Sequence, residues 1–235
     1  MGIKMEMNNL INKREHDPLN RRIYYEVREL IESGAILPGT QLDERTLAQD
    51  LAVSRTPLRE AIATLVEEGL VERRPYRGNF VRLFTAKQVQ DLYEVRKTLE
   101  GLAIRLAVLR LTEEDLELLR TILHEIQEAL ERDDLPGYST SDQRFHSTIA
   151  RLSGNEILIE SLGRLQRQIQ LVRIGANQNP EVVRRTALER PRILSALEMR
   201  DAALAAQLME EHIEGVRRSV IEQIATSSVT EETNL

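Results

Sequence analysis

Two arginines, Arg55 and Arg59, stand four residues apart near the start of a predicted helix. Residues with this spacing lie on one helix face, with their Cβ atoms roughly 5–6 Å apart. An arginine fork meets O6 and N7 of a guanine together in the major groove, and recognition helices present such donors at their N-terminal end. Ser54 and Thr56 flank Arg55, where short hydroxyls and helix N-terminal amides can hold phosphate. The group predicts a DNA-reading surface, although such arginines can also simply be exposed to solvent on the surface of a helix.

Three predicted helices would position these side chains. Apolar residues recur at helical spacing in a first helix near Asn20–Ser33. Asp43 is expected to cap a short second helix, because its carboxylate can accept a hydrogen bond from a free backbone N–H. The third helix is expected to start at Ser54 and to run to about Glu68, with Pro57 in its first turn, where a missing N–H costs nothing.

A predicted hairpin follows the three helices. Leu70–Arg73 and Asn79–Arg82 alternate between apolar and polar residues as strands do. The turn between them carries Arg77 and Gly78, which could approach phosphate or the minor groove because glycine lets the backbone come close. Arg45, in the second helix, could reach the DNA backbone or a base. Three helices followed by a hairpin make a winged helix-turn-helix, and this order of elements predicts DNA binding.

The remaining sequence predicts helices only. They are expected at residues 85–110, 112–132, 139–152, 155–176, 181–199 and 201–224, with breaks at 135–137 and 177–180. Amphipathic helices in this number pack as an antiparallel bundle. The expected fold is therefore mainly α, with an N-terminal winged helix-turn-helix and a C-terminal six-helix antiparallel bundle.

Four segments follow from this interpretation. Residues 1–19 are expected to be a flexible arm, and residues 20–84 the DNA-binding domain. Residues 85–224 are expected to bind an effector and to dimerise. The polar residues 225–235 are expected to be disordered.

Three arginines of the helical part, Arg96, Arg173 and Arg190, lie on otherwise apolar helix stripes. Arginines that point into a core are costly unless anions pair with them. Asp142 is one candidate partner, whereas Glu94 and Glu100 are expected on other faces of the helix that carries Arg96. The other candidate is a bound carboxylate, which an arginine fork can hold through two hydrogen bonds.

The N-terminal motifs resemble those of the GntR family of bacterial transcription regulators. The resemblance covers residues ~20–84 and rests on LPGTQL at 37–42, VSRTPLREA at 53–61 and EGLV at 68–71. It implies that Arg45, Arg55, Arg59 and the wing at Gly78 touch operator DNA.

The C-terminal motifs resemble the FCD domain, the effector-binding domain of the FadR subfamily. The match is carried by DLYEVR at 91–96, LE at 99–100, FH at 145–146, SGN at 153–155 and the late His212. Two residues of these motifs, Tyr93 and Asn155, are assigned with the three arginines to the expected effector site. Six predicted helices rather than seven suggest the VanR-like branch.

The same resemblance raises the possibility of a metal. Members commonly bind one divalent ion through an Asp and three His, and Asp142, His146 and His212 match three of these ligands. Arg190 stands at the remaining His position. Asp142 and His146 are four residues apart, a geometry that can chelate, whereas a lone inward-facing His is usually a hydrogen-bonded core residue.

Two versions of the pocket therefore remain open. In one, Asp142, His146 and His212 hold an ion such as zinc and leave positions open for a water and an acidic effector. In the other, no metal is bound and Arg190 takes the effector carboxylate directly. Both versions predict a small anionic ligand.

Composition excludes several classes of protein. The chain has 235 residues and no Cys, which excludes disulfides, thiolate metal sites and cysteine nucleophiles. No apolar run approaches the ~20 residues of a membrane span, and the polar residues 1–20 lack the apolar core that a signal peptide would have. We therefore expect a cytoplasmic protein without membrane contact. The net charge of −6 argues against an architectural DNA-coating protein.

The combined features predict a ligand-responsive transcription regulator, most simply a repressor. A homodimer is expected because two winged helices that read an inverted repeat need a two-fold axis. The alternative is a metal-dependent hydrolase in the helical bundle, fused to a DNA-binding module. No separate general base, oxyanion donor or Gly-rich phosphate loop supports that alternative, so we expect no enzyme activity.

Overall fold

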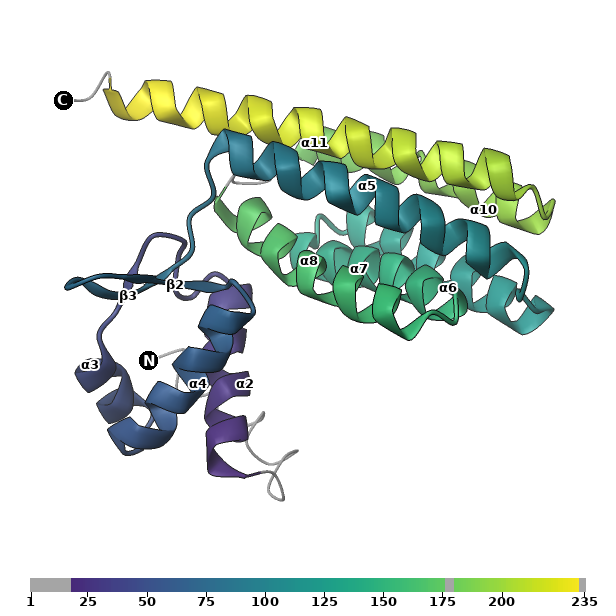
Figure 1. Cartoon of the computed structure of the whole chain (residues 1–235). Helices are drawn as coiled ribbons and strands as arrows, with labels where there is room; N and C mark the ends of the chain where they lie inside the picture. Colours follow the sequence, from purple (N-terminus) through teal and green to yellow (C-terminus); the bar gives the residue numbers. More distant parts are fainter. Residues whose placement is uncertain (1–17, 176–179, 233–235) are drawn as a thin grey trace. The chain divides into compact units, whose positions relative to one another are not determined.

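The computed structural model describes residues 18–175 and 180–232 (Figure 1). Within these ranges the regular structure consists of helices and three short strands, joined by turns and loops, which confirms the predicted mainly α fold. Contacts divide the chain into two compact units. One comprises the described part of 1–83 together with 170–175, and the other comprises 84–169 with the described part of 176–235.

Three helices build the N-terminal unit: α2 (Leu19–Glu32), α3 (Glu44–Asp50) and α4 (Arg55–Glu67). The helices α2 and α4 pack against each other and bury one apolar stripe each. The buried side chains of these stripes are Ile23, Val27, Ile31, Leu58, Ala61, Ile62 and Leu65. All three helices lie within a residue or two of the predicted ranges, because apolar periodicity and capping residues mark them in the sequence.

The caps of this unit differ in their chemistry. The Asp43 carboxylate accepts a hydrogen bond of 2.7 Å from the backbone N–H of Thr46, as predicted. Ser54 occupies the N-cap position of α4, but its side chain makes no capping hydrogen bond.

A three-stranded sheet of order β1-β3-β2 completes the N-terminal unit. The hairpin of β2 (Val71–Arg74) and β3 (Gly78–Val81) was predicted, and its strands pair antiparallel. The third strand, β1 (Gln41–Leu42), pairs with β3 and was not predicted. Two residues carry no alternation that a sequence pattern could reveal. The side-chain amide of Gln41 also donates to the carbonyl of Arg77 at 2.8 Å, which holds the hairpin turn against β1.

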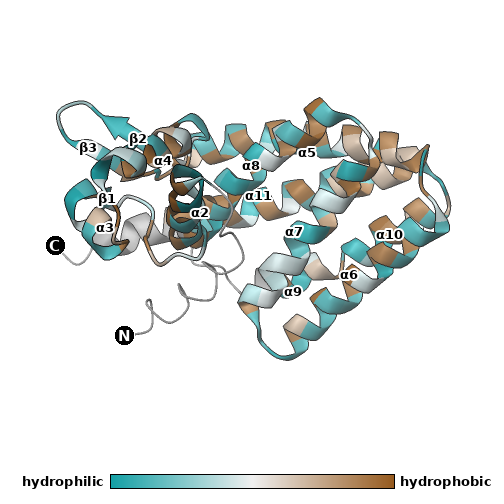
Figure 2. Ribbon diagram, turned by 90° about the horizontal axis from the view of Figure 1, so that it is seen from below, coloured by the Kyte–Doolittle hydropathy of each residue, from teal (hydrophilic) through white to brown (hydrophobic). Residues whose placement is uncertain are grey.

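The C-terminal unit is built from long helices, and Figure 1 shows the longest lying beside the first. Their bounds are α5 Ala86–Val108, α6 Glu113–Glu131, α7 Leu135–Leu152, α8 Glu156–Gly175, α9 Pro180–Ala187, α10 Arg190–Glu198 and α11 Ala202–Glu232. Thr85 and Thr112 close capping boxes at the starts of α5 and α6. Figure 2 shows hydrophobic and hydrophilic residues alternating along the helices, as expected when each buries one stripe.

The described C-terminal residues form seven helices where six were predicted. The predicted fifth helix, 181–199, is interrupted at Leu188 and Glu189, and α10 starts anew at Arg190. Pro191 lies in the first turn of α10. A proline at this point lacks the N–H that would continue α9, and its ring would clash with the preceding turn. The six-helix count that suggested the VanR-like branch is therefore wrong.

Two other predicted boundaries differ. Residues 135–137 were expected to separate two helices, but they form the first turn of α7. Pro136 is tolerated there because its missing N–H would have no partner in the helix. The Asp134 carboxylate accepts a hydrogen bond of 2.9 Å from the backbone N–H of Gly137. The last helix was expected to end near Ile224, with a disordered tail after it. Instead α11 continues to Glu232, because no Gly or Pro interrupts that stretch. The expected arm up to residue 17, the loop residues 177–179 and the last three residues lie outside the described residues.

Among the residues that the structure describes, no helix is both long enough and apolar enough to cross a bilayer.

Candidate functional site: an exposed basic surface and a buried charge cluster

The predicted DNA-contacting residues all lie on the surface of the N-terminal unit. They are Arg45 on α3, Ser54, Arg55, Thr56 and Arg59 at the start of α4, and Arg77 and Gly78 at the hairpin turn. Exposure is what a DNA-reading surface requires, since its donors must reach phosphates and base edges. Their contact with DNA remains a prediction.

A carboxylate that the sequence did not single out organises this surface. Glu44, the first residue of α3, accepts a hydrogen bond of 2.6 Å from Nε of Arg59 and lies 3.8 Å from Nη2 of Arg55. Its other oxygen accepts from the side-chain amide of Asn79 on β3, at 3.4 Å. Glu44 therefore joins α3, the start of α4 and the hairpin. No periodicity marks such a residue, because its partners are distant in the sequence.

The C-terminal unit contains a cluster of charged side chains in its core. Arg96 on α5 donates from Nε to Oε1 of Glu100 at 2.6 Å, and Oε2 of Glu100 pairs with Nδ1 of His146 on α7. Arg96, Glu100 and His146 are all buried. Burial opposes ionisation of Glu100, but the charges of Arg96 and His146 prevail and lower the pKa of its carboxyl to about 2. Glu100 is therefore an anion bound by two neighbours.

A second buried ion pair lies beside the first. Arg190 on α10 pairs with Asp142 on α7, and both side chains are fully buried. Arg190 also donates to the hydroxyl of Tyr138 and to the carbonyl of Thr186, each at 3.0 Å. Oδ1 of Asp142 lies 3.6 Å from Nε2 of His146, which links the two pairs.

His212 on α11 completes the cluster. Its ring stacks on that of His146, with a centroid separation of 5.6 Å and an angle of 19°. Its Nδ1 lies 2.7 Å from Oε2 of Glu189. Burial is the main cause that lowers the pKa of His212, to about 3, so the ring is neutral. A carboxylate can only accept, so the proton sits on Nδ1 and Nε2 keeps its lone pair.

Several buried polar atoms of the cluster make no hydrogen bond within the described residues. They are the two Nη atoms of Arg96, the hydroxyl of Tyr93, and Nε2 of both His146 and His212. Buried polar groups in native proteins are nearly always hydrogen-bonded. These atoms therefore keep free hydrogen-bonding capacity inside the core, and binding of an effector there remains a prediction.

Two protein-family profiles match the chain. The first, described as bacterial regulatory proteins of the gntR family, matches residues 19–81. The second, described as the FCD domain, matches residues 91–215, which is more than half of the chain. The chain belongs to the GntR family. It also carries the FCD domain typical of one of its subfamilies, as the sequence motifs predicted.

Known relatives agree with this assignment. The HTH-type transcriptional repressor RspR of Escherichia coli is 31% identical over 86% of this chain and 89% of its own length. The Nta operon transcriptional regulator of Aminobacter aminovorans is 37% identical over 58% of this chain and 64% of its own. The solved structure of E. coli McbR/YncC has a TM-score of 0.78 and 25% identity, and covers 88% of this chain and 99% of its own. This GntR-family protein is a DNA-binding transcription regulator rather than an enzyme.

The metal that the FCD resemblance implied does not fit the residues present. Asp142, His146 and His212 do lie together, yet Arg190 binds the carboxylate that a metal would need. Across residues 18–175 and 180–232, no group of three or more His, Asp or Glu side chains is arranged to hold a metal ion.

The remaining predicted effector residues fall in different places. Tyr93 is buried, with its ring centroid 5.8 Å from the guanidinium carbon of Arg96. Arg173 is buried near the end of α8, in the segment grouped with the N-terminal unit. Asn155 is exposed, and its side chain caps α8 by accepting from the N–H of Leu158 at 3.1 Å. A role in effector binding stays a prediction for all three.

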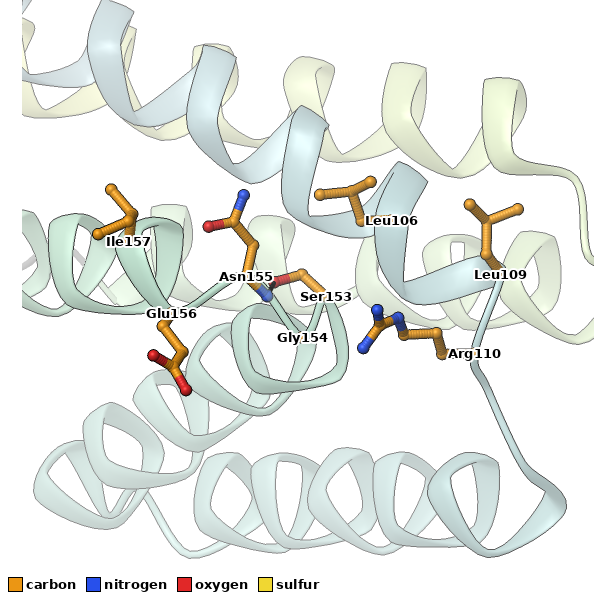
Figure 3. Close-up of a pocket in the computed structure, with 8 residues that line it drawn as sticks. All are labelled: Leu106, Leu109, Arg110, Ser153, Gly154, Asn155, Glu156 and Ile157. Atoms are coloured by element: carbon orange, nitrogen blue, oxygen red, sulfur yellow. Dashed lines mark hydrogen bonds between the residues drawn. The ribbon is translucent and has the colours of Figure 1, made fainter.

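Asn155 lines a pocket of about 550 Å³ at the junction of α7 and α8 (Figure 3). Its other lining residues are Leu106, Leu109, Arg110, Ser153, Gly154, Glu156 and Ile157. None of them belongs to the buried charge cluster. The structure thus separates Asn155 from the arginines with which it was grouped.

Two carboxylates of the cluster were missed or misplaced by sequence reasoning. Glu100 was expected on another face of its helix than Arg96, but the two pair directly. Their spacing of four residues was a sufficient signal, because residues four apart share a face. Glu189, the partner of His212, was not considered. It lies in the interruption between α9 and α10, which was itself not predicted.

Proposed function

We propose that this regulator is a repressor that binds operator DNA as a homodimer and releases it when a small carboxylate binds to the buried charge cluster. Residues 20–84 would read the DNA, and residues 85–224 would bind the effector and form the dimer. The expected location is the cytoplasm. The observation that carries the proposal is Arg96, whose two Nη atoms are buried and make no hydrogen bond in the described residues.

The charge and shape of an arginine support a carboxylate ligand. The Nε edge of Arg96 is already used by Glu100. Its two Nη atoms form the end of the fork, which can meet both oxygens of a second carboxylate. A ligand held there would contact α5, on which Arg96 and Glu100 stand, and α7 through His146.

Release of DNA requires that the effector binds one arrangement of the dimer better than another. A ligand with equal affinity for both arrangements changes nothing, however tightly it binds. The expected linkage is therefore reciprocal: an acid that lowers operator affinity must itself bind more weakly when operator is present. Repression is supported by one relative, which is named as a repressor.

The test begins with selection of an operator from random duplex DNA. Operator affinity is then measured by fluorescence anisotropy with and without carboxylic acids, and the dimer by analytical ultracentrifugation. We expect an inverted-repeat operator, a dimer, and release by an acid. Arg96→Lys keeps the charge but removes the fork and is expected to abolish release. Arg132→Lys changes an exposed arginine that is ion-paired with Glu128 and serves as the matched control. Operator binding that no acid changes would contradict the proposal.

A further inference from the structure

The turn between β2 and β3 carries a tyrosine that contributes little to the packing of its unit. The side chain of Tyr76 is fully exposed, and it makes no hydrogen bond or ring contact within the described residues. Figure 2 shows the hairpin projecting from the helices of the N-terminal unit. A single exposed aromatic residue is common on protein surfaces, so the backbone and the neighbours of Tyr76 must decide whether it has a role.

The backbone at Tyr76 adopts an unfavourable conformation. Its φ is +60°, in the left-handed region. Pro75 precedes it, and the N–H of Arg77 donates to the carbonyl of Arg74 at 3.1 Å. The third position of a turn with positive φ favours glycine or asparagine, because a larger side chain crowds the backbone there. Strained residues of this kind gather at functional sites, so the strain indicates that the ring itself is used.

The hairpin holds its turn rigidly. The side-chain amide of Gln41 on β1 donates to the carbonyl of Arg77 at 2.8 Å. Below the turn, the guanidinium carbon of Arg74 lies 4.3 Å from the centre of the Phe80 ring. These contacts fix both strands, so Tyr76 is presented to a partner on a preformed support. Little backbone freedom would be lost when a partner binds.

The charges around Tyr76 suit a polyanion. Arg77 follows it directly, and Arg73 stands on β2; both are exposed and have no ion pair within the described residues. Arg74 differs from them, because its Nε donates to the carboxylate of Glu72 at 2.6 Å. An aromatic ring with unpaired arginines beside it matches the chemistry of a nucleic acid, whose phosphates attract arginine and whose sugars and bases pack on rings.

The hairpin is joined to the start of α4 by a chain of contacts. Arg73 lies opposite Asn79 in the strand register, so the two share one face of the sheet. The side-chain amide of Asn79 donates to Glu44 at 3.4 Å, and Glu44 accepts from Nε of Arg59 at 2.6 Å. The hairpin and the start of α4 therefore form one surface. When a helix reads the major groove, an arm beside it can reach the adjacent minor groove.

We propose that Tyr76 reads the minor groove beside the bases that α4 contacts. Its ring packs against the deoxyribose wall of the groove, and its hydroxyl donates to N3 of an adenine or O2 of a thymine. In a G·C pair the amino group of guanine projects into the same place, so A·T pairs are preferred. The inference concerns DNA reading alone and goes beyond the proposed function, because it needs neither repression nor an effector.

The first experiment compares three base pairs at each position flanking a selected operator: A·T, G·C and inosine–cytosine. The inosine pair has the major-groove pattern of G·C but lacks the amino group in the minor groove. We expect the full-length protein to bind duplexes with A·T or inosine flanks about two- to tenfold more tightly than those with G·C, the range of one net hydrogen bond. Anisotropy titrations measure these ratios.

Two substitutions assign the preference to Tyr76. Tyr76→Phe keeps the ring but removes the hydroxyl, so the ratio of inosine to G·C affinity should fall towards one. Tyr76→Asn also removes the ring and should weaken binding to all three duplexes. Its melting temperature should stay the same or rise, because asparagine tolerates positive φ. Tyr25→Phe, which removes a hydroxyl that accepts from Arg21 on α2, is the matched control and should leave the ratio unchanged.

A fluorescence experiment locates the side chain directly. The chain contains no tryptophan, so Tyr76→Trp carries a single one. We expect quenching of its emission by acrylamide to fall several-fold when operator binds. Met199→Trp places the fluorophore at an exposed position of the other unit, and its quenching should not change.

Four outcomes would overturn the inference. Equal quenching of Tyr76→Trp with and without operator would exclude contact with DNA, and an unchanged inosine ratio in Tyr76→Phe and Tyr76→Asn would exclude reading of the groove. A lower melting temperature of Tyr76→Asn would make the tyrosine structural. Protection that appears without DNA, as the protein concentration rises, would assign the ring to an interface between protein molecules. Operator that no acid releases would contradict only the proposed function, because these ratios are measured without an effector.

Discussion

Arg190 and Asp142 form a buried ion pair at the position where the family resemblance places a histidine and an aspartate as metal ligands. A charge pair of this kind is costly to desolvate but much more costly to break. Because of this pair, the place predicted for a metal ion already contains the positive charge of Arg190. The sequence left both versions of the pocket open, and the geometry favours the version in which Arg190 takes the place of the ion.

Removal of the negative partner should destabilise the fold. Asp142→Asn would leave the Arg190 guanidinium without its anion in the core, and we expect the free energy of unfolding to fall by about 3–5 kcal/mol. Urea denaturation followed by circular dichroism measures this change. Glu128→Gln, which alters an exposed pair with Arg132, should have little effect. If both variants lose the same free energy of unfolding, burial of the Asp142–Arg190 pair does not account for the loss in Asp142→Asn.

The recognition helix gives a second prediction. Arg55→Ala and Arg59→Ala should each reduce specific operator binding by about 1–3 kcal/mol, because each removes a donor suited to a guanine edge. Anisotropy titrations with operator and with scrambled DNA measure the change. Arg132→Ala, which changes an exposed side chain at the end of α6 in the other unit, is the control. Unchanged affinity in both variants would show that the start of α4 is not the recognition surface.

Glu44 should act as a positioning residue for Arg59. The Glu44→Gln substitution keeps the size of the side chain but removes the charge that holds Nε of Arg59 at 2.6 Å. We expect binding to scrambled DNA to strengthen, because one negative charge near the phosphates is lost. The affinity for operator should rise less than the affinity for scrambled DNA, or should fall, because Glu44 no longer orients Arg59. The ratio of the two affinities should therefore fall several-fold.

The decisive quantity for Glu44 is that ratio and not the operator affinity alone. Glu60, one residue after Arg59, is an exposed carboxylate that accepts a hydrogen bond of 3.2 Å from the side-chain amide of Asn20. Glu60→Gln therefore provides the matched loss of charge. If both substitutions raise operator and scrambled affinities equally, Glu44 acts only through its charge.

Much of the fold could be predicted because its signals are local. Asp43, Thr85 and Thr112 mark helix starts by their side-chain chemistry, and the apolar stripes mark the helices that follow. Proline was the main source of error. Pro136 was predicted to break a helix but lies in the first turn of one, whereas Pro191 was placed inside a helix but separates two. Whether proline starts or ends a helix depends on which neighbour can cap it, and tertiary packing decides this.

The site was predictable only in part, for a different reason. Arg96, Arg190 and His212 were correctly expected to point inward, since each stands on an apolar stripe, and Asp142 was named as a candidate partner for the arginines. The bridging role of Glu100 could not be predicted, because it depends on His146 from another helix. Periodicity shows which face of a helix is buried, but the partners on that face come from the packing of helices distant in the sequence.

Restoring a histidine at position 190 should create the metal site that Arg190 prevents. In Arg190→His the Asp142 carboxylate would lose its cation, and three imidazoles with one carboxylate would be available as ligands, a set suited to zinc. We expect about one zinc per chain by elemental mass spectrometry after soaking and desalting, and little in the unmodified protein. The double variant Arg190→His, His212→Ala should lose this zinc again. If Arg190→His folds, as judged by circular dichroism, and takes up no zinc, then Arg190 is not the feature that excludes the metal. If the unmodified protein already holds one zinc that His212→Ala removes, the metal-free pocket is wrong.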